Sequence, residues 1–393
     1  MLLTTRRSAD HRSRAGLAAL SLGSFGIGLT EFILAGLLSP VARDLDVSLS
    51  AAGQLVTGYA LAVVVGAVAL TPLLLHRPPR NALVLLMGLF VAGNLLSAFA
   101  PDYSSLMVGR VIAALCHGGF FGIGAVVAGD MVRPDRRAGA IAGMFAGLTL
   151  ANVLGVPLGT LVGQQYGWRA TFWLITLVGV IALVALRTVV PRLPPRNDGP
   201  LRSQFAMVTA RPVLASIALT AAVFGGVFGA FTYIEPLLTS VSGFDEAAVP
   251  WLLVLFGVGL VVGNVIGGRA ADRNLAVTLA TLVTLLPLVL AGLALVSSHR
   301  VPTAIALTLL GLVGFATVAP LQLRVLSYAA RAPIIASATN IAAFNLGNTI
   351  GVAAGGYALA GFGLVAPVWT GACLCLLGFL LLVVSTLSRK ARR

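Results

Sequence analysis

Long apolar stretches separated by short polar segments run through the whole chain. A helix that crosses a bilayer needs roughly 20 apolar residues, because each residue adds about 1.5 Å to its length. Such a helix also satisfies its own backbone hydrogen bonds, which the lipid cannot do for it. We therefore expect an all-α membrane protein with twelve transmembrane helices, at residues 15–38, 50–75, 81–100, 104–129, 138–163, 169–190, 213–238, 247–268, 275–297, 302–326, 333–359 and 364–387.

The basic residues indicate which ends of these spans face the cytoplasm. Lys and Arg accumulate in the cytoplasmic segments that connect membrane spans. With the N-terminus inside, 22 of the 26 Lys and Arg residues fall in cytoplasmic segments and three fall outside. The remaining one, Arg110, lies within a span. The split supports the count of twelve, and it predicts that both termini are cytoplasmic and that the first apolar stretch is a retained span.

The longest polar interval divides the spans six and six. It covers residues 191–212 and is rich in proline, which is typical of a linker. We therefore expect an N-terminal six-helix half at residues 1–190, a cytoplasmic linker at 191–212 and a C-terminal six-helix half at 213–393.

A weak internal repeat agrees with this division. The pattern Asn-x-x-Gly-x-x-x-Gly begins at Asn152 and recurs at Asn348, an offset of 196 residues. The same offset relates His76-Arg77 to Asp272-Arg273. Duplicated six-span halves are a known transporter architecture, with the substrate site near the bilayer midplane between them.

Composition removes the other broad classes. The chain is 58% hydrophobic and 10% charged, whereas soluble proteins carry about 25% charged residues. The net charge of +14 does not predict a nucleic-acid partner, because the basic residues lie in short clusters between apolar stretches. We find no metal-ligand cluster, nucleotide-binding loop or nucleophile constellation, so we expect no enzyme activity, no cofactor and no metal.

Ionisable groups inside the spans are the first candidates for function. A central charge in a membrane helix costs roughly 2.5–3.5 kcal/mol, so such groups are retained for a reason. Glu31 is the candidate proton carrier, and Arg110 is its candidate electrostatic partner. His117 follows Arg110 by seven residues, and Glu235 closes the seventh span. The alternatives are a structural ion pair for Glu31, an Arg110 side chain that reaches the interface, a packed His117 and a solvated Glu235.

Uncharged polar and aromatic residues at membrane depth are candidates for a substrate cavity. A cavity with few charges and several aromatic rings suits a neutral, partly hydrophobic ligand. Hydrogen bonds between helices are the alternative role of the polar ones. The candidates are Gln54, Tyr59, Asn152, Phe120, Phe228 and Asn345, with Gln322, Asn340, Phe121, Phe224 and Phe231 as further members of the set.

Several motifs resemble those of the major facilitator superfamily. Gly268-Arg-Ala-Ala-Asp272-Arg273 resembles its loop signature, and Leu106-Met-Val-Gly-Arg110 is similar to the span-four motif of its proton-driven members. Gly155-Val-Pro157-Leu-Gly159 resembles the span-five motif of its drug-exporting branch. Thr30-Glu31-Phe32, Ala114-Leu-Cys-His117-Gly118 and Gly167-Trp168-Arg169 resemble its bacterial sugar-efflux and chloramphenicol-resistance group.

This resemblance covers essentially the whole chain, and it implies roles for two groups of residues. Gly268, Asp272 and Arg273 would form a loop that gates one conformation, although the first-half copy has Pro72 and His76 where the family has Gly and Asp. Gly155 and Gly159 would let two helices pack closely. Pro157 would bend the fifth span. Packing without any gating role is the alternative for this second group.

The sequence therefore predicts a secondary active transporter in the bacterial plasma membrane. We expect a proton-coupled antiporter that exports a small neutral or weakly charged compound by alternating access, such as a chloramphenicol-like drug or a sugar. Its partners would be the small molecule, protons and the lipid bilayer. The alternatives are an uncoupled facilitator or importer of the same fold, and a membrane enzyme or sensor.

Overall fold

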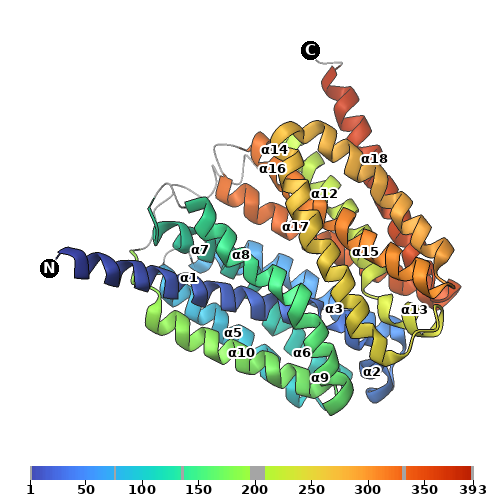
Figure 1. The fold of residues 1–393 in the computed structure, drawn as a ribbon, viewed down its shortest axis with the longest axis horizontal. Helices are drawn as coiled ribbons and strands as arrows, with labels where there is room; N and C mark the ends of the chain where they lie inside the picture. The colour runs from blue at the N-terminus through green and yellow to red at the C-terminus, as the bar shows by residue number, and fades with distance from the viewer. Residues whose placement is uncertain (1, 75–76, 134–136, 195–208, 330–332, 391–393) are drawn as a thin grey trace.

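The protein, described here from a computed structural model, is a bundle of long helices (Figure 1). The structure describes residues 2–74, 77–133, 137–194, 209–329 and 333–390, and no strand occurs in these ranges. The all-α prediction is therefore confirmed. The predicted linker lies partly, and His76 wholly, outside the described residues.

The first group of helices spans residues 2–189. Two of the predicted spans in this group contain a short π-helical turn, labelled η1 and η3. The elements are α1 (Leu2–Phe32), α2 (Leu34–Asp44), α3 (Leu49–Val65), η1 (Gly66–Leu70), α4 (Thr71–Leu74), α5 (Pro79–Phe99), α6 (Tyr103–Ala114), α7 (His117–Asp130), α8 (Arg137–Leu150), η3 (Ala151–Gly155), α9 (Val156–Tyr166) and α10 (Trp168–Val189).

The second group of helices spans residues 211–390. Its elements are α12 (Arg211–Phe231), α13 (Ile234–Ser240), the 3-10 helix η4 (Glu246–Ala248), α14 (Val249–Val296), α15 (Arg300–Ala316), α16 (Val318–Tyr328), α17 (Pro333–Phe362) and α18 (Ala366–Lys390).

The helices are consistent with twelve membrane crossings. Ten apolar helical segments of the described chain are long enough to span a bilayer. One of them runs for 51 residues, from Glu246 to Val296, and its backbone leaves helical geometry at Asn274 (φ −156°, ψ 95°). At about 1.5 Å per residue such a length suffices for two crossings of a bilayer core about 30 Å thick. Counting that segment twice and adding the 30-residue α17 gives twelve.

Several spans are each interrupted by one or two turn residues, so that each consists of two consecutive helices. Turn residues separate α1 from α2 at Ile33, α6 from α7 at Leu115–Cys116 and α12 from α13 at Thr232–Tyr233. Each break leaves backbone groups outside the regular helical ladder, and polar side chains collect next to these points.

The two groups of helices meet at one end of the bundle, which we call the closed end. Figure 1 shows them converging near α2, α9 and α13 and diverging toward the end where α1 begins. Close to the closed end, α3 packs along α17 and α2 packs against α13. At the other end, Ser13 bonds the Met131 carbonyl and Arg324 bonds Ser216, each within one group.

Two of the contacts between the groups reproduce the internal repeat of the sequence. The Phe32 and Phe228 rings stack with centroids 5.2 Å apart, and these positions differ by 196 residues. Ser39 is hydrogen-bonded to Glu235, which is again 196 residues further on. Equivalent positions of the two predicted halves therefore touch each other. Such contacts are expected next to a two-fold axis that relates the two halves.

Candidate functional site

A cluster of buried ionisable side chains lies inside the first group of helices. Glu31 is the last residue but one of α1, His117 begins α7, and Tyr59 lies in the middle of α3. The His117 Nδ1 atom is 3.9 Å from Glu31 Oε2 and 3.5 Å from the Tyr59 hydroxyl. None of the three is more than 9% exposed. The helix breaks at Ile33 and at Leu115–Cys116 bring these groups together from three spans.

Arg110 of α6 joins this cluster without pairing to an acid. Its side chain is fully buried, and its guanidinium carbon lies 4.3 Å from the centre of the Tyr59 ring. Nη1 donates to the carbonyl oxygen of Thr30 and, at 3.1 Å, to the Thr30 hydroxyl. The ion pairs between described residues do not include Arg110, while Nε and Nη2 have no hydrogen-bond partner. Glu31, the expected partner of Arg110, directly follows Thr30 in the sequence. The basic group nearest to the Glu31 carboxylate is nevertheless His117 rather than Arg110.

Glu235 lies at the contact between the two groups of helices and is not a solvated helix end. It is only 3% exposed. The Ser39 backbone N–H and the Ser39 hydroxyl donate to its Oε2 atom at 3.0 Å and 2.5 Å. Because α12 breaks at Thr232–Tyr233, Glu235 falls in the first turn of α13 and faces α2. Its hydrogen bonds therefore join the two groups of helices.

Further bonds surround Glu235 at the closed end. Arg43 forms an ion pair with Glu246 at 3.0 Å, and Gln164 donates to the Glu246 carbonyl at 2.7 Å. Ser50 donates to the Gly356 carbonyl at 2.8 Å. Each of these bonds joins one group of helices to the other.

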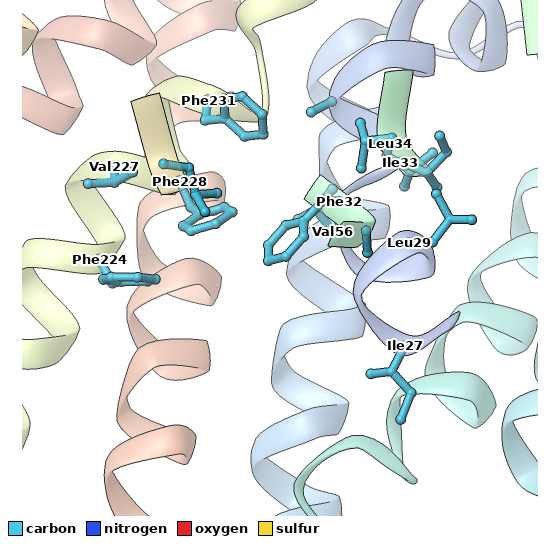
Figure 2. Close-up of a cluster of buried hydrophobic side chains, with 14 of the residues drawn as sticks. Ile27, Leu29, Phe32, Ile33, Leu34, Val56, Phe224, Val227, Phe228 and Phe231 are labelled. Atoms are coloured by element: carbon cyan, nitrogen blue, oxygen red, sulfur yellow. The ribbon is translucent and has the colours of Figure 1, made fainter. Parts of the chain in front are cut away.

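Aromatic rings of the second group face Phe32 of the first group across the bundle. Figure 2 shows Phe224, Phe228 and Phe231 of α12 opposite Phe32 of α1, with Phe228 and Phe32 directed toward each other. Phe344 of α17 packs edge-on against Phe224 at 4.3 Å between ring centres. The first group thus supplies the ionisable side chains and the second supplies an aromatic wall.

The other predicted cavity residues do not gather around one point. Gln54 lies near the closed end, where α3 packs against α17 beside Gly356. Asn152 and Asn345 each donate to a carbonyl one turn earlier in their own helices, at 3.1 Å. The Asn345 Oδ1 atom is buried without a partner.

Phe120 departs from the prediction, because it lies in the core of the first group and not at a cavity. It is fully buried, and its ring occupies the space next to Gly23 of α1. A groove of about 330 Å³ does open on the surface of α14 and α15, lined by apolar residues such as Leu255, Val301 and Ile305. It contains none of the predicted cavity residues.

The glycines of the predicted gating set differ from one another. A Cβ atom on Gly159 would come within 2.7 Å of Ile33, and one on Gly155 would come within 3.0 Å of Phe25, so both glycines admit α1 closely. Pro157 lies in the first turn of α9, directly after the π-helical turn η3. Gly268 is different, because a Cβ atom there would meet no atom within 4 Å. Close packing therefore does not explain Gly268.

Asp272 and Arg273 also differ from the expected loop pair. Both belong to α14, whose helical geometry continues to the break at Asn274. They form no ion pair with each other in the described structure. A continuous helix is compatible with Gly268-Arg-Ala-Ala-Asp272, because the segment has no proline and its arginine and two alanines favour a helix.

Three residues near these sites were not singled out from the sequence as functional. Thr30 and Asn94 are fully buried and hydrogen-bonded to each other at 2.6 Å, and Ser39 bonds Glu235. The sequence could have indicated Asn94, because it is an amide inside the apolar stretch at 81–100 and polar side chains in a membrane span need hydrogen-bond partners.

Two relatives are similar to this chain over most of its length. The inner membrane transport protein YdhP of Escherichia coli (strain K12) is 42% identical over 370 residues, 94% of this chain and 95% of the relative. A chloramphenicol resistance protein of Streptomyces lividans is 33% identical over 339 residues, 85% of this chain and 86% of the relative.

Solved structures share the fold at low sequence identity. A D-xylose–proton symporter has a TM-score of 0.74 at 17% identity, covering 94% of this chain and 96% of its own. A bacterial homologue of the human lysosomal transporter Spinster, solved inward-facing and unoccupied, has a TM-score of 0.70 at 16% identity, covering 95% of both chains. The Major Facilitator Superfamily model matches residues 20–341. This multi-pass membrane protein therefore belongs to the Major Facilitator Superfamily of transporters.

Proposed function

We propose that this transporter is a proton-coupled antiporter that exports a small neutral or weakly charged compound. The proposal rests on the buried cluster of Glu31, His117, Tyr59 and Arg110. Glu31 precedes Phe32, whose ring stacks on Phe228 of the other group of helices. A buried carboxyl without a hydrogen-bonded cation can exist in its neutral form, and it can release a proton when the surrounding space opens to water. Glu31 is the residue that we expect to carry the proton.

The proposed direction is export, with the closed end facing the outside. The excess of basic residues at the opposite end favours a cytoplasmic location for that end. On this orientation the structure is inward-facing, and both termini are cytoplasmic. The bonds of Glu235, Glu246 and Gly356 would then be the outer gate, which must separate during each transport cycle.

The proposed substrate is an uncharged or weakly charged molecule with an apolar, preferably aromatic, part. The described interior has one fully buried cation, Arg110, and an aromatic wall of Phe224, Phe228 and Phe344. The relative from Streptomyces lividans is a chloramphenicol resistance protein, which makes chloramphenicol the first compound to test.

Accumulation of labelled chloramphenicol in cells that express the protein tests this proposal. We expect low accumulation that rises when a protonophore is added, and high accumulation with Glu31→Gln. Asp245→Asn is the matched control, because Asp245 is an exposed acid outside the cluster. Accumulation at the empty-vector level, reached by a flux that the protonophore does not change, would instead favour an uncoupled facilitator, and accumulation above the empty-vector level would favour an importer.

A further inference from the structure

Arg110 is a buried cation whose position depends on one short chain of hydrogen bonds. The chain runs from Arg110 through the Thr30 hydroxyl to Asn94 Oδ1, at 3.1 Å and 2.6 Å. All three side chains are fully buried, and they come from α6, α1 and α5. Apart from the Thr30 carbonyl and the face of the Tyr59 ring, these bonds are what holds the guanidinium.

The direction of this chain is fixed by its far end. Asn94 Nδ2 donates to the Phe90 carbonyl at 2.8 Å, and a carbonyl can only accept. The amide oxygen of Asn94 must therefore face Thr30, so the Thr30 hydroxyl donates its single proton to Asn94. Only lone pairs of that hydroxyl remain for Arg110, which needs acceptors. Asn94 thus makes the Thr30 hydroxyl an acceptor for Arg110, although Asn94 does not itself bond to Arg110.

The chain occupies one edge of the guanidinium and leaves the other edge unused. Nη1 makes both bonds to Thr30, while Nε and Nη2 have no partner in the described structure. Glu31 follows Thr30 in the chain, and the charges of Glu31 and Arg110 attract each other. A carboxylate at Glu31 could use the free edge, but Arg110 does not turn toward it while Thr30 accepts from Nη1.

We propose that Asn94 and Thr30 are positioning residues that hold Arg110 beside Glu31 without letting it pair permanently with the Glu31 carboxylate. This inference rests on the proposed role of Glu31 in proton coupling. A permanent pair would stop the cycle, because Glu31 would then keep its charge and take up no proton. The Asn94–Thr30 chain lets Arg110 stabilise the carboxylate only transiently.

The pH dependence of transport by purified protein in liposomes tests this role. Thr30→Val removes the hydroxyl acceptor and leaves Nη1 only the carbonyl of residue 30. Arg110 is then held less firmly and can turn toward Glu31, so we expect the half-maximal pH of exchange to fall by about one unit, the size of one charge-assisted hydrogen bond. Thr30→Ser keeps the hydroxyl and should retain the wild-type profile. Asn94→Leu should shift the profile in the same direction as Thr30→Val.

Asn94→Asp provides a change of opposite sign. Its carboxylate would draw Arg110 away from Glu31, and the half-maximal pH of exchange should rise. Ser97→Ala is the control on the same helix, because the Ser97 hydroxyl bonds only the Gly93 carbonyl one turn earlier. Its profile should match the wild type.

The outcomes separate this inference from the proposed function. If wild-type exchange itself does not depend on a proton gradient, the proposed function fails. If wild-type exchange is proton-driven and requires Glu31, but Thr30→Val and Asn94→Asp keep the wild-type pH profile, only the positioning role is overturned. Opposite shifts for these two variants, with Thr30→Ser unchanged, support it.

Discussion

Single polar side chains inside the bundle carry the chemistry proposed for this transporter. Glu31 has a histidine 3.9 Å away and no hydrogen-bonded cation among the described residues, whereas Glu235 accepts two hydrogen bonds from Ser39. The two acids are therefore not equivalent, although the sequence suggested the same role for both. Glu31 is available for a proton, and Glu235 is engaged across the bundle.

Asp44 offers a test of electrostatics at the closed end, outside the membrane spans. Hydrogen bonds from Arg169 Nη1 at 2.5 Å and Trp168 Nε1 at 3.0 Å hold the pKa of Asp44 below its usual range. Because that pKa is lower in the folded state, the stabilisation is complete above the unfolded value of about 4 and is lost as the pH falls through the folded value.

We expect Asp44→Asn to destabilise the protein at pH 7 by about 0.2–1 kcal/mol, a small effect because this pair is partly exposed and screened by solvent. The loss should disappear in strong acid. Melting curves of detergent-solubilised protein at a series of pH values measure it, with Asp46→Asn as the control. An equal loss at every pH would show that the carboxylate charge is irrelevant.

At the scale of helices, the apolar pattern predicted most of what the structure contains. Most predicted spans end within a few residues of a helix end, and the span at 81–100 corresponds to α5, Pro79–Phe99. The first span is the exception, since α1 begins at Leu2 and α2 continues to Asp44. The breaks at Ile33 and Thr232–Tyr233 and the π-helical turns were not predicted. A buried helix remains apolar on both sides of a break, so the apolar pattern does not predict the position of the break. Asn94 was missed for a related reason, since its importance lies in its bonds to Thr30 and Phe90.

Two glycines that look alike in sequence should respond differently to alanine. A Cβ atom on Gly147 of α8 would overlap the backbone oxygen of Ser21 in α1, whereas one on Gly268 would meet nothing within 4 Å. We expect Gly147→Ala to cost about 1–3 kcal/mol by overpacking. Gly268→Ala should be neutral or stabilising by up to about 1 kcal/mol, because alanine favours a helix. Thermal unfolding in detergent compares them, and equal stabilities would contradict the close packing of α1 and α8.

At the scale of the whole molecule, the repeat of 196 residues acquires a physical meaning. Phe32 meets Phe228 and Ser39 meets Glu235, so the contact runs between equivalent positions of the two predicted halves. The domain bounds at residues 190 and 213 remain a prediction. Nothing in a hydrophobic pattern indicates which end of the bundle is closed, and that information came only from the contacts themselves.

A cross-link at the closed end should arrest transport. If the bond between Ser39 and Glu235 breaks in every cycle, a Ser39→Cys/Glu235→Cys protein should lose most of its transport on oxidation and recover it on reduction. Cys116, Cys373 and Cys375 are replaced by alanine first, and each single cysteine variant is the control. Full transport by a fully cross-linked protein would rule out opening at this end.

Proton movement coupled to substrate uptake tests the central proposal most directly. In liposomes that contain the purified protein and a pH-sensitive dye, added chloramphenicol should enter while protons leave, so the interior becomes more alkaline. Glu31→Gln should abolish this change, and Asp245→Asn should preserve it. Chloramphenicol uptake without proton movement, or unchanged proton movement in Glu31→Gln, would contradict proton-coupled exchange through Glu31.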